Sequence, residues 1–164
     1  MADRSPEDSA RIAADNLAQA RRWIGLISTR DLEGLEEMLP PDHLYTAVWR
    51  NPESYGRLRT KAEFLHEITD WGPHTKTPVT MKIISELATA DRVVLEAEGE
   101  GIMRDGYVYA NSYCFIFWIS SGRIDAIHDY CCTNTGRLLE DHLRSAFPDE
   151  DNLFDTVARQ DLPN

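Results

Sequence analysis

Residues 122–130 read Gly-Arg-Ile-Asp-Ala-Ile-His-Asp-Tyr, a turn followed by the last of four strands that decide the fold. From Pro78 onward the apolar residues repeat with a period of two, which is typical of strands that bury one face. Tight-turn sequences separate the strands at Ala90-Asp91, Asp105-Gly106 and Ser120-Ser121-Gly122. We therefore predict a meander of antiparallel strands over 79–87, 92–103, 107–119 and 123–132.

The segment before Pro78 carries helix signals instead. Ser5-Pro6-Glu7-Asp8 combines a capping residue, a proline suited to the first helical position and two carboxylates at the positive end of the helix dipole. Thr60 and Glu63 have the spacing of a capping box. The expected elements are helices over 5–28, 31–39 and 60–70, a strand over 43–49, a loop over 50–59, and a final helix over 133–147.

This order of elements predicts an α+β fold. The three N-terminal helices should cover one face of a strongly curved antiparallel sheet, which gives a half-barrel with a cavity between helices and sheet. Such a cavity suits a small apolar ligand. We expect one domain over residues 1–147, followed by an acidic tail over 148–164.

Composition narrows the expected partners. A net charge of −11 argues against binding to nucleic acid or to a membrane surface, because both require excess Lys and Arg. The longest apolar run, residues 114–119, is too short to span a bilayer, and the polar, acidic start does not look like a signal peptide. Cys114, Cys131 and Cys132 lack Cys-x-x-Cys spacing, so we expect reduced thiols in a cytoplasmic protein and no metal site.

Asp129 is the main candidate for chemistry. Along the last strand, Ile127, Asp129 and Cys131 point to one side, and His128 points to the other, away from Asp129. If the Asp129 side faces the cavity, Ile127 is an apolar contact for a ligand, and burial raises the pKa of the carboxyl toward neutral pH, where proton transfer is efficient. The alternative is a carboxylate at the rim, bonded to a neighbouring group.

A second group of candidates lies on other strands. Aromatic residues alternate with Asn111 along residues 107–117, a pattern that favours a core or dimer contact over a substrate platform. Asn111 and Tyr113 are nevertheless candidates for donating hydrogen bonds to a substrate oxygen. Tyr45 and Trp49, in the first strand, are candidates for lining the mouth of the cavity.

In the order of its elements over about residues 8–146, the chain resembles the SnoaL-like group of the nuclear transport factor 2 superfamily, which has a cystatin-like fold. The resemblance rests on Gly122-Arg123-Ile124, on Asp129-Tyr130, and on the stretches Tyr-Ala-Asn-Ser-Tyr at 109–113 and Ala-Glu-Gly-Glu-Gly at 97–101. The superfamily includes ketosteroid isomerases, polyketide cyclases, limonene epoxide hydrolases and scytalone dehydratases, so the fold implies a pocket rather than one reaction.

The resemblance also implies catalysis by acids and hydrogen-bond donors, without metal or cofactor. Asp129 matches the acid that limonene epoxide hydrolases and SnoaL-type cyclases place on the last strand. The hydrolases' Arg and Asp, two apart on an earlier strand, correspond to Glu98 and Glu100, so that charge pattern is broken. The isomerase base, an Asp before Pro, corresponds to Asn51 before Pro52, and an amide cannot act as the base.

The role of Glu98 has two readings. The residues alone indicate that Glu96, Glu98 and Glu100 form a solvated row, because burial of like charges is costly. The resemblance implies instead that Glu98 faces the pocket and shares a proton with Asp129. It further implies a homodimer through the outer sheet face, where Ile116 and Trp118 are apolar.

Two hypotheses follow. The first is a cofactor-independent enzyme (a cyclase, isomerase, dehydratase or epoxide hydrolase) that acts on a small hydrophobic molecule through Asp129, with Glu98 or a tyrosine as partner. The second is a non-catalytic ligand-binding or dimerisation module of the same fold. A desolvated Asp129 beside a second polar group in a cavity favours the first.

Overall fold

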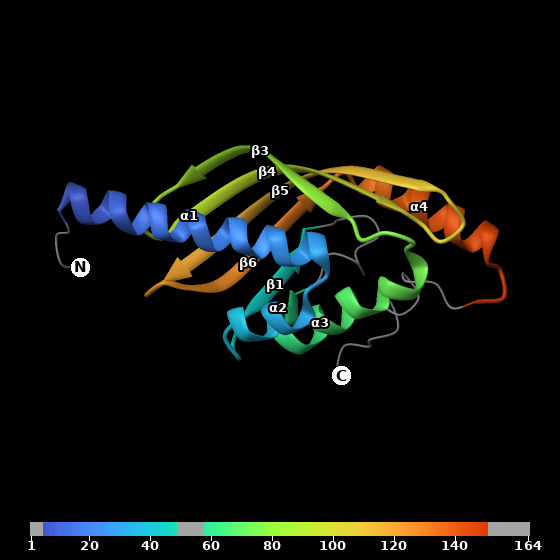
Figure 1. Cartoon of the computed structure of the whole chain (residues 1–164), viewed down its shortest axis with the longest axis horizontal. Helices are drawn as coiled ribbons and strands as arrows, with labels where there is room; N and C mark the ends of the chain where they lie inside the picture. The colour runs from blue at the N-terminus through green and yellow to red at the C-terminus, as the bar shows by residue number, and fades with distance from the viewer. Residues whose placement is uncertain (1–4, 49–57, 151–164) are drawn as a thin grey trace.

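The computed structural model describes residues 5–48 and 58–150 of the chain. Its helices are α1 (Pro6–Thr29), α2 (Leu32–Met38), α3 (Lys61–Asp70), the short 3-10 turn η2 (Gly72–His74) and α4 (Thr133–Ala146). Its strands are β1 (Leu44–Ala47), β2 (Leu58–Thr60), β3 (Thr80–Ala88), β4 (Arg92–Ile102), β5 (Val108–Ser120) and β6 (Arg123–Cys131). Figure 1 shows α1 crossing one face of the sheet, with α2 and α3 beside β1 and α4 at the far end.

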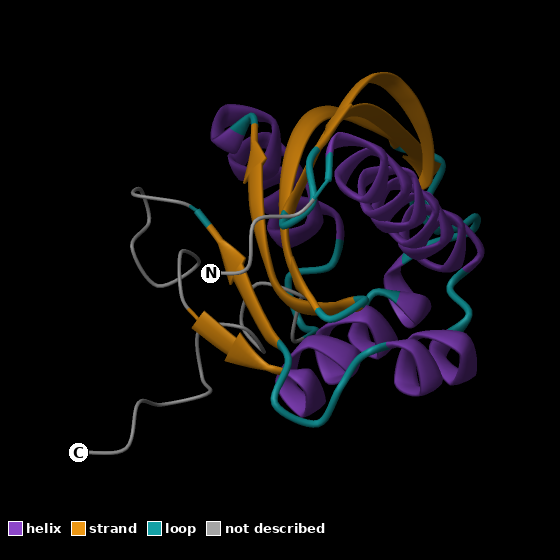
Figure 2. Cartoon of the chain, turned by 90° about the vertical axis from the view of Figure 1, so that its left-hand side faces the viewer, coloured by secondary structure: helices purple, strands orange, loops and turns teal. Residues whose placement is uncertain are grey.

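The strands form one six-stranded sheet in the order β2-β1-β6-β5-β4-β3. The sheet curves around the helices without closing into a barrel, as Figure 2 shows. The predicted α+β half-barrel is therefore confirmed. One refinement concerns strand direction: β1 runs parallel to β6, whereas the other neighbouring pairs are antiparallel.

The prediction of a loop over 50–59 was wrong at its end. Leu58, Arg59 and Thr60 pair with β1 in antiparallel register. A three-residue strand is too short to display an alternating pattern, so no pattern in the sequence indicated this strand. Trp49 lies outside the described residues, as do residues 151–164 of the expected acidic tail, and the domain boundary at 147 stays a prediction.

Trp23 lies at the centre of the core. Its side chain is 1% exposed, and its ring centroid lies 5.2 Å from that of Phe115 and 5.5 Å from that of Phe117, both in edge-to-face geometry. The ring centroid of Phe64 in α3 lies 6.1 Å from that of Trp23, in stacked geometry. These contacts join α1 to β5 and to α3, so one side chain connects all the layers around the cavity.

Replacing Trp23 with Ala should lower the free energy of unfolding by about 3–5 kcal/mol, because a large side chain is removed from a packed site. Leu87→Ala is the control: Leu87 is 66% exposed, and its truncation should change stability by no more than about 0.5 kcal/mol. Urea denaturation followed by circular dichroism measures both. Similar losses in the two variants would contradict the central position of Trp23.

Candidate active site

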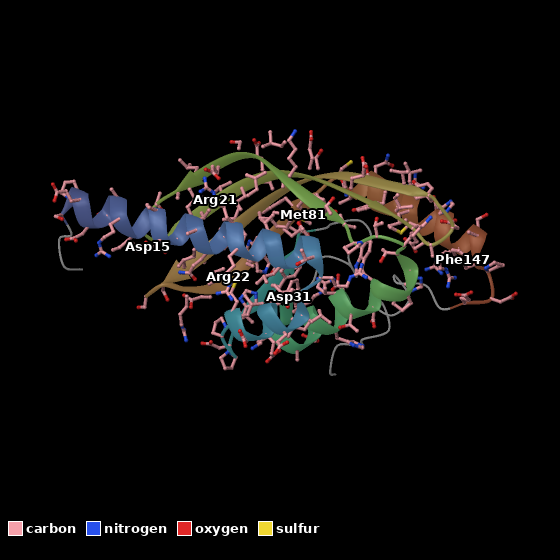
Figure 3. All side chains as sticks on the ribbon, viewed as in Figure 1. Asp15, Arg21, Arg22, Asp31, Met81 and Phe147 are labelled. Carbon is pink, nitrogen blue, oxygen red and sulfur yellow. The ribbon has the colours of Figure 1, made fainter. Side chains whose placement is uncertain are left out.

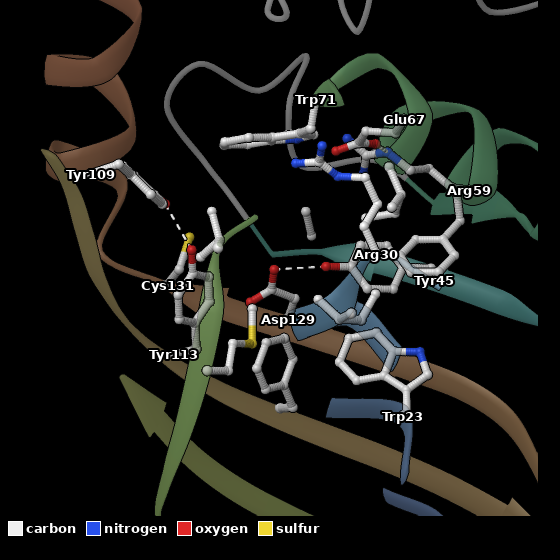
Figure 4. A pocket seen from close by; sticks show the side chains of 17 residues that line it. Trp23, Arg30, Tyr45, Arg59, Glu67, Trp71, Tyr109, Tyr113, Asp129 and Cys131 are labelled. Atoms are coloured by element: carbon white, nitrogen blue, oxygen red, sulfur yellow. Dashed lines mark hydrogen bonds and ion pairs between the residues drawn. The ribbon is translucent and has the colours of Figure 1, made fainter. Parts of the chain in front are cut away.

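A cavity of about 150 Å³ lies between the concave face of the sheet and helices α1 and α3 (Figure 4). Most of its lining is apolar. Met81 closes one side, between β3 and α1 (Figure 3). The polar lining residues are few, and they come from different elements: Arg30, Tyr45, Arg59, Glu67, Tyr109, Tyr113 and Asp129.

Asp129 faces this cavity from the middle of the sheet. It lies opposite Phe115 of β5 and next to Ala47 of β1 in register, and it is only 8% exposed. His128 lies on the other face, where its ring centroid is 4.2 Å from that of Trp118. The period of β6 thus separates the acid from the neighbouring histidine.

Burial raises the pKa of Asp129 to about 7. The Tyr45 hydroxyl opposes this shift, because it donates a hydrogen bond of 2.7 Å to Oδ2 and so favours the ionised form. The Glu67 carboxylate raises the pKa further, and the Arg59 guanidinium lowers it. Near neutral pH the carboxyl therefore populates both its protonated and its ionised form.

The two oxygens of Asp129 have different surroundings. Oδ2 accepts the hydrogen bond from Tyr45, whereas the buried Oδ1 has no hydrogen-bond partner among the described residues. The pKa of Tyr45 is held well above its usual value, chiefly by burial and then by the Asp129 charge, so Tyr45 remains a neutral donor. Tyr45 fixes the orientation of the carboxyl and leaves Oδ1 to receive or release a proton.

An ion pair forms the wall next to Tyr45. Arg59 of β2 lies opposite Tyr45 in register and is 2% exposed, and its guanidinium pairs with the Glu67 carboxylate of α3. A buried guanidinium needs such a partner, since an isolated buried charge is very costly. The pair brings two opposite charges close to Asp129, and their effects on its pKa have opposite signs.

A chain of hydrogen bonds occupies the opposite wall. The Asn111 amide donates to Tyr109 Oη at 2.9 Å, and the Tyr109 and Tyr113 hydroxyls lie 2.8 Å apart. Burial raises the pKa of Tyr109 to about 12 and that of Tyr113 well above its usual value, so both phenols stay protonated. One of the two hydroxyl protons makes the hydrogen bond between them, which leaves the other available. When Tyr109 donates to Tyr113, the free proton is that of Tyr113, which lines the cavity.

The structure does not bring together all of the candidate residues. Asp129, Tyr45 and Tyr113 line one cavity, as Figure 4 shows. Asn111 supports this site from behind, because its amide nitrogen donates to Tyr109 and to the Cys132 carbonyl. Ile127 is fully buried in the core and does not line the cavity.

The pairing of Glu98 with Asp129, which the resemblance implied, is corrected by the structure. Glu98 is exposed and lies opposite Ser112 in register. The neighbouring pair, Ala97 and Tyr113, points to the concave face of the sheet, so Glu98 points to the outer face. Asp129 belongs to the buried side of the sheet, so the two carboxyls lie on opposite faces. The solvated row over Glu96, Glu98 and Glu100 is the reading that agrees with the structure.

Sequence reasoning missed Arg30, Arg59, Glu67 and Trp71 as lining residues. A usable signal existed for α3, because Phe64, Glu67, Ile68 and Trp71 have the i, i+3, i+4, i+7 spacing of one helix face. No such signal existed for Arg59, which lies in the short strand β2, or for Arg30, which ends α1.

Over the part of the chain that the structure describes, no group of three or more His, Cys, Asp or Glu side chains is arranged to hold a metal ion. None of the helices within residues 5–48 and 58–150 is both long and apolar enough to cross a membrane.

Comparisons with known proteins identify the fold. A family model for a SnoaL-like domain matches residues 20–127. Similar solved structures include PrhC from Penicillium brasilianum NBRC 6234, with 15% identity over 90% of this chain and 94% of its own and a TM-score of 0.75. No curated protein matches the sequence significantly.

Two further solved structures carry names of enzymes. The BvnE pinacolase from Penicillium brevicompactum is 9% identical over 82% of this chain and 98% of its own, with a TM-score of 0.72. An LEH-like epoxide hydrolase from M. tuberculosis is 16% identical over 84% of this chain and 98% of its own, with a TM-score of 0.64. At these identities the likeness shows the shared fold and not a shared reaction.

Replacing Asp129 with Asn should remove a pH dependence of stability. The native carboxyl has a pKa of about 7, whereas an unfolded Asp titrates at about 4. Between these values the native state binds more protons than the unfolded state, so the wild-type free energy of unfolding falls as pH rises through this window. Asp129→Asn stays neutral and should gain stability relative to wild type by up to about 4 kcal/mol above neutral pH.

Urea denaturation of both proteins at several pH values measures this difference, in which the other titrating groups cancel. Asp125→Asn is the control, because Asp125 lies on the same strand but does not line the cavity. A difference between wild type and Asp129→Asn that is constant across pH would show that Asp129 does not take up a proton in the folded state.

Proposed function

The chain belongs to the SnoaL-like domain family, and from this premise we propose that it is a cofactor-independent enzyme that transfers protons on a small hydrophobic molecule. One observation carries the proposal. Asp129 is buried in an apolar cavity, which raises its pKa to about 7, and its Oδ1 has no hydrogen-bond partner among the described residues. A carboxyl so placed is matched to acid/base catalysis near neutral pH, and strongly shifted pKa values gather at functional sites.

The proposed chemistry begins with the ionised form of Asp129. Oδ1 accepts a proton from a carbon adjacent to a carbonyl group, and the electron pair of that C–H bond moves onto the carbonyl oxygen. The Tyr113 hydroxyl donates a hydrogen bond to the resulting enolate, as an oxyanion-stabilising group. When the substrate is a β,γ-unsaturated ketone, the enolate is conjugated with the double bond. Protonated Asp129 then returns the proton to the γ carbon while the carbonyl group re-forms, which gives the conjugated isomer of the substrate.

The residues favour proton transfer over water-activating epoxide opening. The positions that correspond to the charged pair of the epoxide hydrolases, Glu98 and Glu100, are both exposed on the outer face. Two acids line the cavity, and Glu67 pairs with Arg59. Asp129 is therefore the acid that we assign to proton shuttling, with Tyr45 as the group that orients it. The cavity of about 150 Å³ matches in size an engineered protein cavity that binds benzene, so the enclosed part of the substrate is about one ring.

Hydrogen exchange in D₂O tests this function directly. Wild-type protein should accelerate deuterium incorporation next to the carbonyl of cyclic and monoterpenoid ketones, followed by NMR spectroscopy. Asp129→Asn should lower the exchange rate by about 10²–10⁴-fold, because the proton acceptor is lost. Asp125→Asn should leave the rate unchanged, since that carboxyl does not line the cavity.

The pH profile supplies a second criterion. Because the ionised carboxyl acts first, the wild-type rate should rise with pH and level off above about 7. Equal exchange by wild type and Asp129→Asn would refute the assigned role. Ketones that bind in the cavity without any acceleration of exchange would support the alternative, a non-catalytic ligand-binding module.

We also propose that the protein forms a homodimer through the outer face of the sheet. Ile116 and Trp118 lie half-buried on that face, and the Arg92 guanidinium lies 4.9 Å from the Trp118 ring centroid. An aromatic and apolar surface of this kind is suited to association with a second copy.

Sedimentation velocity at micromolar concentration should show a dimer for the wild type and a monomer for Trp118→Arg. Leu138→Arg is the control, because Leu138 is an exposed apolar residue of α4, away from the outer sheet face. A wild type that stays monomeric would remove the proposal of a dimer.

A further inference from the structure

Arg30 occupies a position that suits a smaller residue. It is the residue that caps the C-terminus of α1, with φ 53° and ψ 44° in the left-handed region. Gly or Asn is usual there, and another L-residue costs roughly 1–2 kcal/mol in that conformation. The backbone geometry therefore gives no reason for an arginine, which directs attention to its side chain.

The Arg30 side chain extends from the end of α1 into the wall of the cavity (Figure 4). Its Nη2 donates a hydrogen bond of 2.7 Å to Thr75 Oγ1, and the Thr75 hydroxyl in turn donates to the Trp71 carbonyl. Nη1 lies beside Gly72, close enough that a Cβ at that glycine would be 3.6 Å away. The guanidinium is thus held in place by the segment that follows α3.

The charge of Arg30 has no acidic partner within the described residues. Among the arginines that the structure describes, the others except Arg22 have a carboxylate oxygen within 4.0 Å, and Arg22 is exposed to solvent. Arg30 is half-buried, and burial lowers the pKa of its guanidinium. The other cationic lining residue, Arg59, already pairs with Glu67.

We propose that Arg30 binds a carboxylate of the substrate, so that the cavity takes a small hydrophobic acid with a single ring or a ring-sized apolar body. This inference rests on the proposed function, because it names the substrate class for the same site. A planar guanidinium offers paired N–H donors that match the two oxygens of a carboxylate. A bound anion would neutralise the uncompensated charge, and the apolar lining would contact the ring.

The two ends of such a ligand would meet different groups. The carboxylate would lie at Arg30, where α1 ends, while the ring would extend toward Oδ1 of Asp129 on β6. Arg30 would then act in binding and selectivity, and Asp129 in proton transfer. Binding measurements can therefore test Arg30 without any catalytic step.

Benzoate and its neutral analogue benzamide are the probes, titrated into the protein at neutral pH by calorimetry. Wild type should bind benzoate more tightly than benzamide by about tenfold or more, as expected for a charge-assisted hydrogen bond. Arg30→Asn should lose this preference and remain folded, because Asn tolerates the left-handed conformation. Arg22→Asn, which removes an exposed charge from the same helix (Figure 3), should keep the preference.

Three results would overturn the proposal: no binding of benzoate at millimolar concentration, equal binding of both probes by wild type, or an unchanged preference in Arg30→Asn. The outcome is separable from that of the proton-transfer test, which uses neutral ketones. Asp129→Asn should retain the preference for benzoate. A preference that depends on Arg30, together with no ketone exchange, would leave the acid-binding site standing while the catalytic proposal fails.

Discussion

The packing of α1 into the concave face of the sheet is the interaction on which the rest of the structure depends. Trp23 contacts Phe115 and Phe117 of β5 and Phe64 of α3, and so holds two helices against the curved strands. The cavity lies beside these aromatic rings, and Trp23, Phe64 and Phe115 form part of its lining. Because the same rings exclude water, the apolar packing that stabilises the fold also sets the protonation behaviour of Asp129.

A buried carboxyl in this position opposes stability above neutral pH. Tyr45 offsets part of that cost with a hydrogen bond to Oδ2, and the two members of the Arg59–Glu67 ion pair shift the pKa of Asp129 in opposite directions. The chain therefore retains an acid at a site where an apolar residue would pack at lower cost. Residues that lower the stability of the fold at the place where they are needed are typical of functional sites.

Three polar groups of the cavity can still form a hydrogen bond or an ion pair that the described residues do not supply. Within residues 5–48 and 58–150, Oδ1 of Asp129 has no hydrogen-bond partner, and the Arg30 guanidinium has a hydroxyl partner but no anion. The tyrosine pair opposite Asp129 also retains a hydroxyl proton. A ligand with a carboxylate, an apolar ring and a carbonyl would contact all three polar groups. The cavity therefore offers polar contacts at three places, although most of its lining is apolar.

The sequence by itself determined most of the elements, though not β2, and it determined which residues of one strand share a face. Alternation along β6 separated Asp129 from His128, and alternation along β5 grouped Asn111 with Tyr113, because side-chain direction within a strand depends only on parity. Capping residues such as Ser5 and Thr60 marked the helix starts, because their side chains satisfy backbone N–H groups locally. These features are local, and local rules suffice for them.

Only the tertiary structure decided which residues share the cavity. Tyr45 reaches Asp129 because β1 pairs in parallel with β6, a contact between positions 84 residues apart. Glu98 lies on the outer face of the sheet. Arg59 lines the cavity from β2, a strand too short to show an alternating pattern of apolar residues. The pKa of Asp129 follows from the water that distant side chains exclude. Such effects depend on how separate elements pack together, and no single segment of the sequence specifies them.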